Sequence, residues 1–212
     1  MNIIKKIAIG IFAALLLLVL ISFLLPSRIR VARTTVIKAP PEKIYESVAT
    51  PRTWKEWTAW NSTKYPKMKW DYKGPETGVG AESFWTDPGG DGHMKLTKAD
   101  PKEGVEYDLT FADFPTIPGS IKLVPEGDAT KVTWFFEQDT GWNPVYRYFC
   151  NFMMDSLIGA DFEAGLAGLK KRVEAAPPTV EPSAPPSENT STEKPSPSEN
   201  PPASETPPAK SE

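Results

Sequence analysis

Hydrophobic and polar residues alternate along short runs in the middle of the chain, between residues 67 and 140. Val105, Tyr107 and Leu109, for example, have acidic residues between them. A period of two is typical of a strand with one buried and one wet face, and turn residues rich in Gly, Pro and Asp separate the runs. We therefore expect an antiparallel meander with strands at 67–72, 81–86, 93–99, 105–111, 120–125 and 131–139, preceded by a strand at 29–38.

Two short helices are expected between the first strand and the meander. The first covers residues 41–49, and the second begins after Pro51. The second carries Trp54, Trp57 and Trp60, whose spacing of three residues places them in one stripe. This stripe either caps one end of the core or lines the mouth of a ligand cavity.

A long helix is predicted over residues 143–174. Asn143 is a good N-cap residue, and a proline follows it at the first helical position. At about 100° per residue, the apolar positions of the two halves centre on directions roughly 140° apart. The change falls where Gly159 weakens a helix and Asp161 could cap a restart. We therefore predict a kink or break near Gly159, with the second half held by the sheet and the first half shaping a cavity entrance.

Residues 27–174 are expected to form one domain of α+β class. A sheet that is wet on one face needs a helix layer on the other, so we expect a curved antiparallel sheet of about seven strands around the long helix. Of the 23 aromatic residues in the chain, 21 lie in this range. Either a core or a cavity could contain them.

An N-terminal segment, residues 1–26, is predicted to be a membrane anchor. Residues 7–25 contain no charge, and a run of this length spans about 30 Å of hydrocarbon as a helix. A cleaved signal peptide is the alternative, but no small-residue cleavage site follows the run. Basic residues flank the run on both sides, so the sequence does not decide on which side of the membrane the domain of this single-pass protein lies. We lean toward an extracytoplasmic domain.

The C-terminal segment, residues 175–212, has 11 Pro among 38 residues and very few large apolar ones. Such a composition cannot offset the entropy of ordering, so we expect a disordered tail. It is either a spacer or interaction tail, or an unconstrained terminus.

Charge and cysteine content exclude several classes of function. The chain has a net charge of −3, and its tail, with six Glu and two Lys, contributes −4. The domain is close to neutral, so no strongly basic nucleic-acid-binding face is indicated. A single cysteine, Cys150, excludes an intrachain disulfide and a cysteine-based zinc cluster. No cofactor is expected, and the oligomeric state stays open.

The candidates for metal or nucleophilic chemistry are weak. The chain has one histidine, His93, and it falls on the expected wet face of its strand. Asp87 and Asp91 lie close to it in a Gly-rich turn, where turn chemistry already accounts for both residues. No metal ligand is assigned.

Acid–base chemistry would have to come from the cavity side of the fold. By position, the best candidates are Asp155 and Glu163 on the long helix and Tyr107 on the sheet. None belongs to a recognisable catalytic arrangement, so no catalytic residue is assigned.

Apolar side chains suited to line a ligand cavity come from the short helices, the sheet and the long helix. Ligand pockets are mostly apolar, but so are cores, and composition alone does not separate the two. The candidate lining residues are Trp57, Met94, Leu96, Tyr107, Leu109, Phe111, Trp134, Phe136, Phe149, Phe152 and Met153.

Five short motifs occur in an order that resembles a known family. The chain over residues 29–174 resembles the polyketide cyclase/dehydrase and lipid-transport branch of the START-like (SRPBCC) superfamily. The motifs are Val36–Tyr45 (VIKAPPEKIY), the pair Trp54-x-x-Trp57, Gly78–Ala81 (GVGA), Thr130–Trp134 (TKVTW) and the Asp161–Lys170 segment (DFEAGLAGLK).

The resemblance implies a helix-grip fold, in which a bent antiparallel sheet wraps around a long C-terminal helix and leaves a hydrophobic cavity. Members bind lipids, sterols or polyketides, and some catalyse cyclisation or hydrolysis. The resemblance carries no catalytic residue over to this chain, because fold does not give function. We expect a membrane-anchored domain that binds a small apolar ligand. The alternatives are a cyclase- or hydrolase-type enzyme and an interaction module with a filled core.

Overall fold

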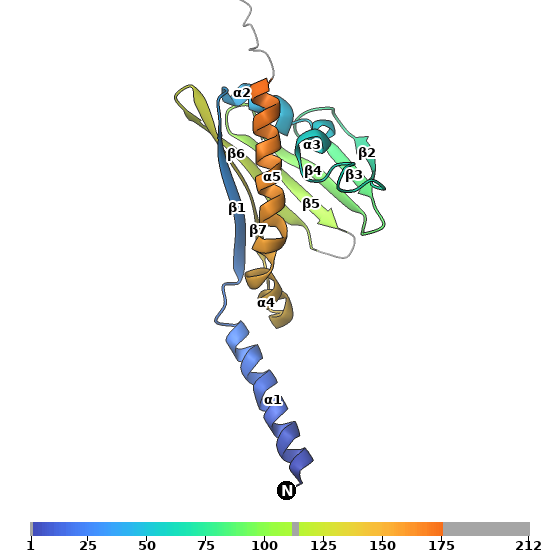
Figure 1. Cartoon of the computed structure of the whole chain (residues 1–212), viewed down its shortest axis with the longest axis vertical. Coiled ribbons are helices and arrows are strands. Elements are labelled where there is room, and N and C mark those ends of the chain that lie inside the picture. Colours follow the sequence, from blue (N-terminus) through green and yellow to red (C-terminus); the bar gives the residue numbers. More distant parts are fainter. Residues whose placement is uncertain (1, 112–114, 176–212) are drawn as a thin grey trace, which may run out of the picture. The chain divides into compact units, whose positions relative to one another are not determined.

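The computed structural model of the chain describes residues 2–111 and 115–175. Apart from Ala175, the expected tail lies outside these residues. The elements in chain order are α1 (Ile3–Ser22), β1 (Arg28–Ile37), α2 (Pro41–Val48), α3 (Pro51–Trp57), β2 (Lys69–Lys73), β3 (Glu82–Thr86), β4 (Gly92–Asp100), β5 (Gly104–Phe111), β6 (Ile117–Glu126), β7 (Ala129–Asp139), α4 (Pro144–Phe152) and α5 (Met154–Ala175) (Figure 1).

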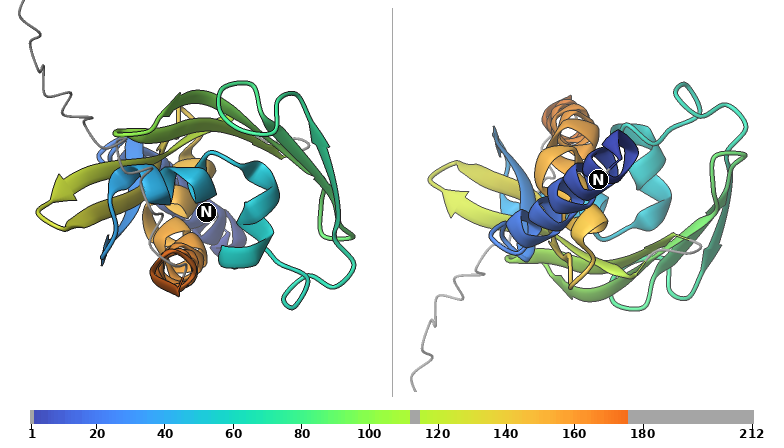
Figure 2. Two further views of the ribbon diagram at one scale, coloured as in Figure 1. Left: turned by 90° about the horizontal axis from the view of Figure 1, so that it is seen from above. Right: turned by 90° about the horizontal axis from the view of Figure 1, so that it is seen from below.

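The seven strands form one antiparallel sheet in the order β1-β7-β6-β5-β4-β3-β2. Strands β2 to β7 are a meander, and β1 pairs with β7 from Arg28 opposite Asp139 to Ile37 opposite Thr130. The sheet is curved, and α2, α3 and α5 lie on its concave side (Figure 2). The predicted α+β class, with a bent sheet of seven strands around a C-terminal helix, is confirmed.

Period-two patterning correctly assigned the two faces of the sheet. Leu96 and Val132 point into the core, and both are fully buried. His93 lies on the outer face, where its ring stacks on Phe84 with centroids 4.2 Å apart and its Nε2 lies 3.3 Å from Glu82. The histidine therefore contacts residues of the adjacent strand β3 on the wet face.

Trp134 on β7 is the centre of the core. The rings of Trp54, Trp57 and Trp60 all contact it, with centroids 5.4 to 5.9 Å away. Phe162 of α5 stacks on it with the ring centroids 4.3 Å apart and the two rings nearly parallel. All three tryptophans pack on the core, and Trp54 and Trp60 also line the pocket described below. Helix α3 ends at Trp57, so Trp60 lies beyond the helix.

The expected break of the long helix near Gly159 was wrong. Helix α4 instead ends at its cap residue Met153, α5 begins at Met154, and α5 then continues through Gly159. A Cβ at Gly159 would meet the guanidinium of Arg33, the flexible end of a long side chain, so the glycine leaves room for Arg33 beside α5. The expected N-cap is confirmed, since the Asn143 side chain accepts a hydrogen bond from the backbone N–H of Tyr146 at 3.1 Å.

The N-terminal helix α1 is long and apolar enough to cross a membrane. Its apolar side chains are exposed along its length, as a span requires. A signal sequence near an N-terminus meets the same criteria of length and composition, and these criteria do not determine the side of the membrane.

Candidate functional site

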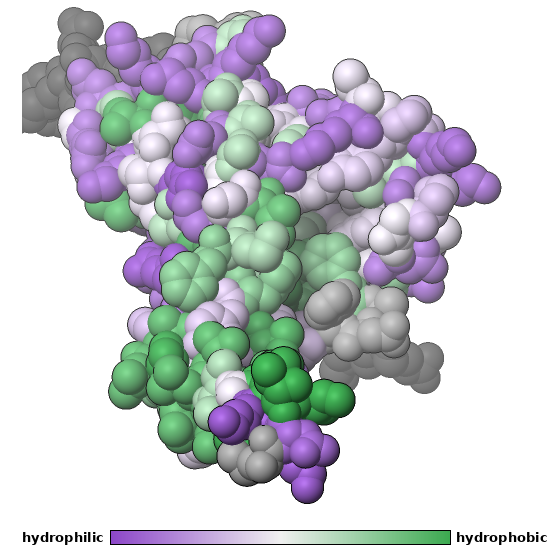
Figure 3. Space-filling view, turned by 60° about the horizontal axis from the view of Figure 1, so that its bottom comes forward, coloured by the Kyte–Doolittle hydropathy of each residue, from purple (hydrophilic) through white to green (hydrophobic). Residues whose placement is uncertain are grey.

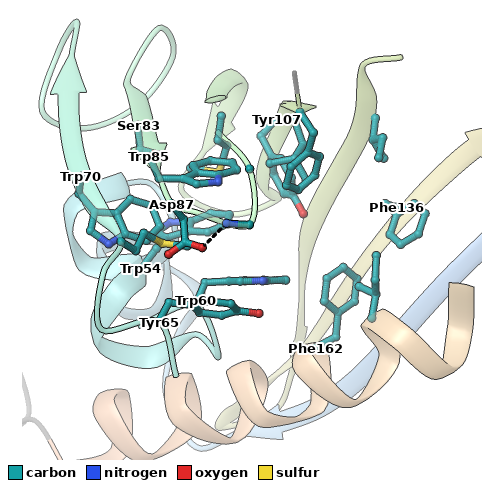
Figure 4. Close-up of a pocket in the computed structure, with 18 of the residues that line it drawn as sticks. Trp54, Trp60, Tyr65, Trp70, Ser83, Trp85, Asp87, Tyr107, Phe136 and Phe162 are labelled. Atoms are coloured by element: carbon teal, nitrogen blue, oxygen red, sulfur yellow. Dashed lines mark hydrogen bonds between the residues drawn. The ribbon is translucent and has the colours of Figure 1, made fainter. Parts of the chain in front are cut away.

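An apolar pocket of about 270 Å³ lies between the concave face of the sheet, the segment after α3 and the first half of α5. Figure 4 shows its aromatic side chains arranged around the space, with Phe136 from β7 and Phe162 from α5 at one side. The lining residues are Trp54, Trp60, Tyr65, Met68, Trp70, Ser83, Trp85, Asp87, Gly89, Gly90, Met94, Tyr107, Leu109, Phe111, Ile117, Trp134, Phe136, Ile158 and Phe162.

The pocket lies at one particular end of the sheet. Leu109 near the end of β5 pairs with Ile117 at the start of β6, and both line the pocket. In an antiparallel sheet this is also the end at which β1 begins and β7 ends, where Arg28 pairs with Asp139. Because α1 precedes β1 and α4 follows β7, the pocket lies at the end of the domain to which α1 and α4 belong. Figure 3, turned to bring this end forward, shows apolar surface and a hollow on the same side.

Four side chains with a hydroxyl or carboxylate group line the pocket among the residues that the structure describes, namely Tyr65, Ser83, Asp87 and Tyr107. Ser83 is buried, and Asp87 accepts a hydrogen bond from the backbone N–H of Gly89 at 2.9 Å (Figure 4). The hydroxyl of Tyr107 accepts a hydrogen bond from Trp134 Nε1 at 2.7 Å, and burial raises the pKa of Tyr107 above its usual range. A tyrosine held in this way keeps its proton, so it can orient a ligand but is a poor base.

One buried donor beside the pocket has no partner within the described ranges. The indole N–H of Trp70 makes no hydrogen bond there, although Trp70 lines the pocket. An unpaired buried donor costs about 1–3 kcal/mol, which a ligand acceptor could recover. This donor, the Asp87 carboxylate and the hydroxyls of Tyr65 and Ser83 are polar groups that could orient a largely apolar molecule.

The structure brings six of the eleven predicted lining residues to the pocket, namely Met94, Tyr107, Leu109, Phe111, Trp134 and Phe136. Trp57 and Leu96 are buried in the core behind it and do not line it. That these residues hold a ligand stays a prediction.

The three predicted residues from the long helix do not line the pocket. Phe149, Phe152 and Met153 belong to α4 and its cap, and all three are exposed on the surface. The break at Met153 turns α4 away from the sheet, so its apolar side chains do not follow the direction of α5.

Sequence reasoning missed most of the residues on the β2–β3 side of the pocket. Trp70 and Trp85 are directly opposite each other on β2 and β3, with ring centroids 5.7 Å apart. The period-two pattern in β2 could have found Trp70, since Lys69 and Asp71 flank it. Tyr65 and Met68 lie between α3 and β2, where no regular period assigns a face.

The two helix carboxylates considered for acid–base work do not face the pocket. Arg33 Nη1 binds Asp155 at 2.9 Å, and Arg33 Nε binds Glu163 at 2.5 Å, so both acids join α5 to β1. Their side chains are mostly exposed. In the described ranges, no group of three or more His, Cys, Asp or Glu residues is arranged to hold a metal ion.

A bent seven-stranded sheet, a long C-terminal helix and an apolar pocket between them define a helix-grip domain. The family model described as polyketide cyclase/dehydrase and lipid transport matches residues 28–174. The chain belongs to this family, and the resemblance to the SRPBCC superfamily is confirmed. A comparison with curated proteins gives no match.

Several solved structures share the fold at low identity. Protein CV1439 from Chromobacterium violaceum is 18% identical, with a TM-score of 0.50 over 71% of this chain and 100% of its own. The Aha1 dimer from Colwellia psychrerythraea is 22% identical, with a TM-score of 0.50 over 69% and 97%. Protein Ms6760 from Mycobacterium smegmatis is 15% identical, with a TM-score of 0.50 over 69% and 91%. At these identities the similarity shows the fold alone.

Proposed function

We propose that this protein is a membrane-anchored domain that binds a small hydrophobic ligand in the pocket between the sheet and α5. The observation that carries the proposal is the pocket itself, a space of about 270 Å³ among side chains that would otherwise pack as core. Protein interiors are close-packed and contain few voids larger than a water molecule. Membership in the polyketide cyclase/dehydrase and lipid-transport family supports binding of such a ligand.

The pocket's size and polar groups restrict the class of ligand. A volume of about 270 Å³ lies just below the range of about 300–1,000 Å³ of pockets for drug-sized ligands, which favours a ligand of modest size. The lining favours a rigid aromatic or polyketide-like body, or one acyl chain. A single oxygen on the ligand could accept from Trp70, and a hydroxyl could donate to Asp87.

Contacts between α1 and the domain support a retained anchor over a cleaved signal sequence. The hydroxyl of Tyr148 donates to the backbone oxygen of Leu18 at 2.9 Å. Arg147 Nη1 donates to the backbone oxygen of Ser22 at 3.1 Å. A segment removed during export would not need such partners in the mature fold. An anchor would raise the concentration of the domain near membrane-soluble ligands.

A thermal-shift comparison in detergent tests the ligand-binding proposal. We expect at least one member of a panel of fatty acids, sterols and aromatic polyketides to raise the midpoint of unfolding of the full chain. Leu109→Trp should remove this shift because the larger ring fills the pocket. The matched control Val124→Trp, at an exposed position of β6 outside the pocket, should retain it. Equal responses of both variants to a binding compound would contradict binding in this pocket.

A cyclase- or hydrolase-type enzyme is the second candidate, and Asp87 is the observation that favours it. Its carboxylate lines the pocket and could act as a base on a bound ligand. Asp87→Asn keeps the hydrogen-bond acceptor for Gly89 and removes the base. Retained ligand binding with lost turnover of that ligand would support an enzyme, whereas binding without turnover in the parent protein supports a binding domain.

A further inference from the structure

Helix α4 has its polar and apolar faces reversed relative to a helix on a water-soluble domain. Val145 is 76% exposed and Phe152 is 66% exposed, whereas Arg147 is only 7% exposed. Surface helices of soluble domains bury the apolar stripe and expose the charges. Arg147 is also the one charged residue in the sequence from 142 to 154. The outward face of α4 is therefore suited to an apolar medium.

The polar side of α4 is occupied by the end of α1 and the segment that follows it. Arg147 donates to the backbone oxygens of Ser22 at 3.1 Å and Gly141 at 2.8 Å. Asn151 donates to the backbone oxygen of Pro26 at 3.2 Å. A cation at a helix C-terminus satisfies carbonyls that have no partner inside the helix. These bonds explain why Arg147 is buried and fix α4 to the end of α1.

A third contact shows which turn of α1 lies beside α4. The hydroxyl of Tyr148 binds the backbone oxygen of Leu18, four residues before α1 ends at Ser22. At about 1.5 Å per residue, Leu18 is about 6 Å from the end of the helix. Helix α4 therefore lies beside the last turn of α1, at the level where a spanning helix leaves the hydrocarbon.

The exposed apolar residues of this region form one surface, which we call the α4 patch. It consists of Trp142, Val145, Phe149, Phe152, Met153 and Leu157. Trp142 is 84% exposed, and its ring lies 5.7 Å from that of Phe23, directly after α1. Aromatic residues are enriched at the two membrane–water interfaces, and amphipathic helices there lie about 5–10 Å into the boundary. Apolar surface gathers at this end in Figure 3.

We propose that the α4 patch inserts into the interfacial layer of the bilayer that α1 crosses. Because the pocket lies at the same end of the sheet, the insertion would hold the pocket end of the domain against the membrane. This inference rests on the proposed anchoring by α1, and it does not require that the pocket binds a ligand. The occupant of the patch is thus the lipid bilayer itself, rather than a second copy of the chain.

Site-directed spin labelling of the full chain in phosphatidylcholine vesicles tests the proposal. In a Cys150→Ala background, single cysteines at Val145 and Phe152 report on the patch. Leu16→Cys within α1 checks the anchor, and Lys102→Cys in the β4–β5 turn, at the opposite end of the sheet, is the aqueous control. Accessibility to oxygen measures exposure to lipid, and accessibility to a water-soluble nickel chelate measures exposure to water.

We expect labels at 145, 152 and 16 to favour oxygen and the label at 102 to favour nickel. Nickel-accessible labels at 145 and 152 together with a lipid-exposed label at 16 would overturn the inference while leaving the anchor intact. A label at 16 that is open to nickel would overturn the anchor and the inference with it. Protection from both reagents, with label–label coupling that grows with the protein-to-lipid ratio, would show a second copy on the patch and also overturn the inference.

A second measurement needs no cysteine. Trp142 is exposed, so Trp142→Phe should leave the fold intact. Brominated phosphatidylcholine quenches tryptophans that contact the bilayer, and the variant should lose a large part of the lipid-dependent quenching of the parent protein. Identical quenching in the parent and the variant would contradict insertion of the patch.

Discussion

Helices α4 and α5 follow each other directly in the chain but have opposite arrangements of polar and apolar residues. In α5, Phe162 and Leu169 are buried against the core, and Glu163 and Lys171 are exposed. In α4, Arg147 is buried and apolar side chains are exposed. The difference shows that the residue types on each face of an amphipathic helix match the environment which that face contacts. For α5 these environments are the core and water. For α4 they are the end of α1 together with the edge of the core, which Cys150 contacts, and, as we propose, lipid.

The close packing of α5 depends on small residues as well as large ones. Gly165 lies against the ring of Trp134, and Gly168 lies against the backbone of Trp57. A Cβ at either position would be too close to its neighbour. These glycines let α5 approach the aromatic core and α3, and α4 has no such contact with the sheet.

Truncation of one phenylalanine in each helix should give the largest difference between them. Phe162→Ala removes a buried ring that stacks on Trp134, so we expect a loss of about 3–5 kcal/mol in the free energy of unfolding. Phe152→Ala changes an exposed position and should alter that free energy by less than about 0.5 kcal/mol. Denaturant unfolding of the full chain in detergent measures both, and similar losses would break the comparison.

Replacing Gly168 and Gly159 of α5 by alanine, one at a time, should have different effects on the free energy of unfolding. Gly168→Ala would meet the backbone of Trp57, which cannot move easily, so we expect a loss of about 1–3 kcal/mol. Gly159→Ala would meet the flexible end of Arg33. A helix-propensity gain of about 1 kcal/mol should offset the displaced exposed ion pairs there, giving a net effect near zero. If Gly159→Ala is the more damaging variant, Arg33 cannot move aside and its contact with α5 is more rigid than this account holds.

The start of α5 should give a smaller, pH-dependent effect. The Arg33 guanidinium, through its hydrogen bonds, holds the pKa of Asp155 below its usual range. A carboxylate with a lowered pKa in the folded state stabilises the fold above its unfolded pKa, and this stability is lost as pH falls through the folded pKa. Asp155→Asn should therefore lose less stability than the parent as pH falls below about 4, the usual pKa of an aspartate.

The control for this pH effect is Asp128→Asn, an exposed residue of the β6–β7 turn. It should follow the parent curve. Urea unfolding at a series of pH values gives the comparison, and parallel curves for Asp155→Asn and the parent would show that the contact with Arg33 contributes nothing to acid stability.

The sheet could be predicted from the sequence because several strands have a clear period of two and turn residues separate the strands of the meander. All seven expected strands are present, and the alternation in β5 correctly placed Tyr107 and Leu109 on the inner face. The pocket could be predicted only in part. Its β2–β3 wall includes Tyr65 and Met68 from an irregular segment, whose position depends on tertiary packing.

The position and role of α4 could not be predicted, although its apolar stripe is evident in the sequence. Treating Phe149, Phe152 and Met153 as cavity residues assumed that apolar side chains turn away from solvent toward the core. Arg147 was the signal against this assumption, since it lies within the same short helix and its partners are backbone oxygens near α1. The prediction of a break at Gly159 was wrong for a related reason. The space beside this glycine is occupied by Arg33, which is far away in the sequence.

The most direct test of the central claim is native mass spectrometry of the full chain extracted in a mild detergent. The account predicts that part of the parent protein carries an additional apolar mass, that Leu109→Trp loses it and that Val124→Trp keeps it. A parent protein found only at the mass of the bare chain, with no shift in thermal stability from any compound of the panel, would contradict a ligand-binding pocket.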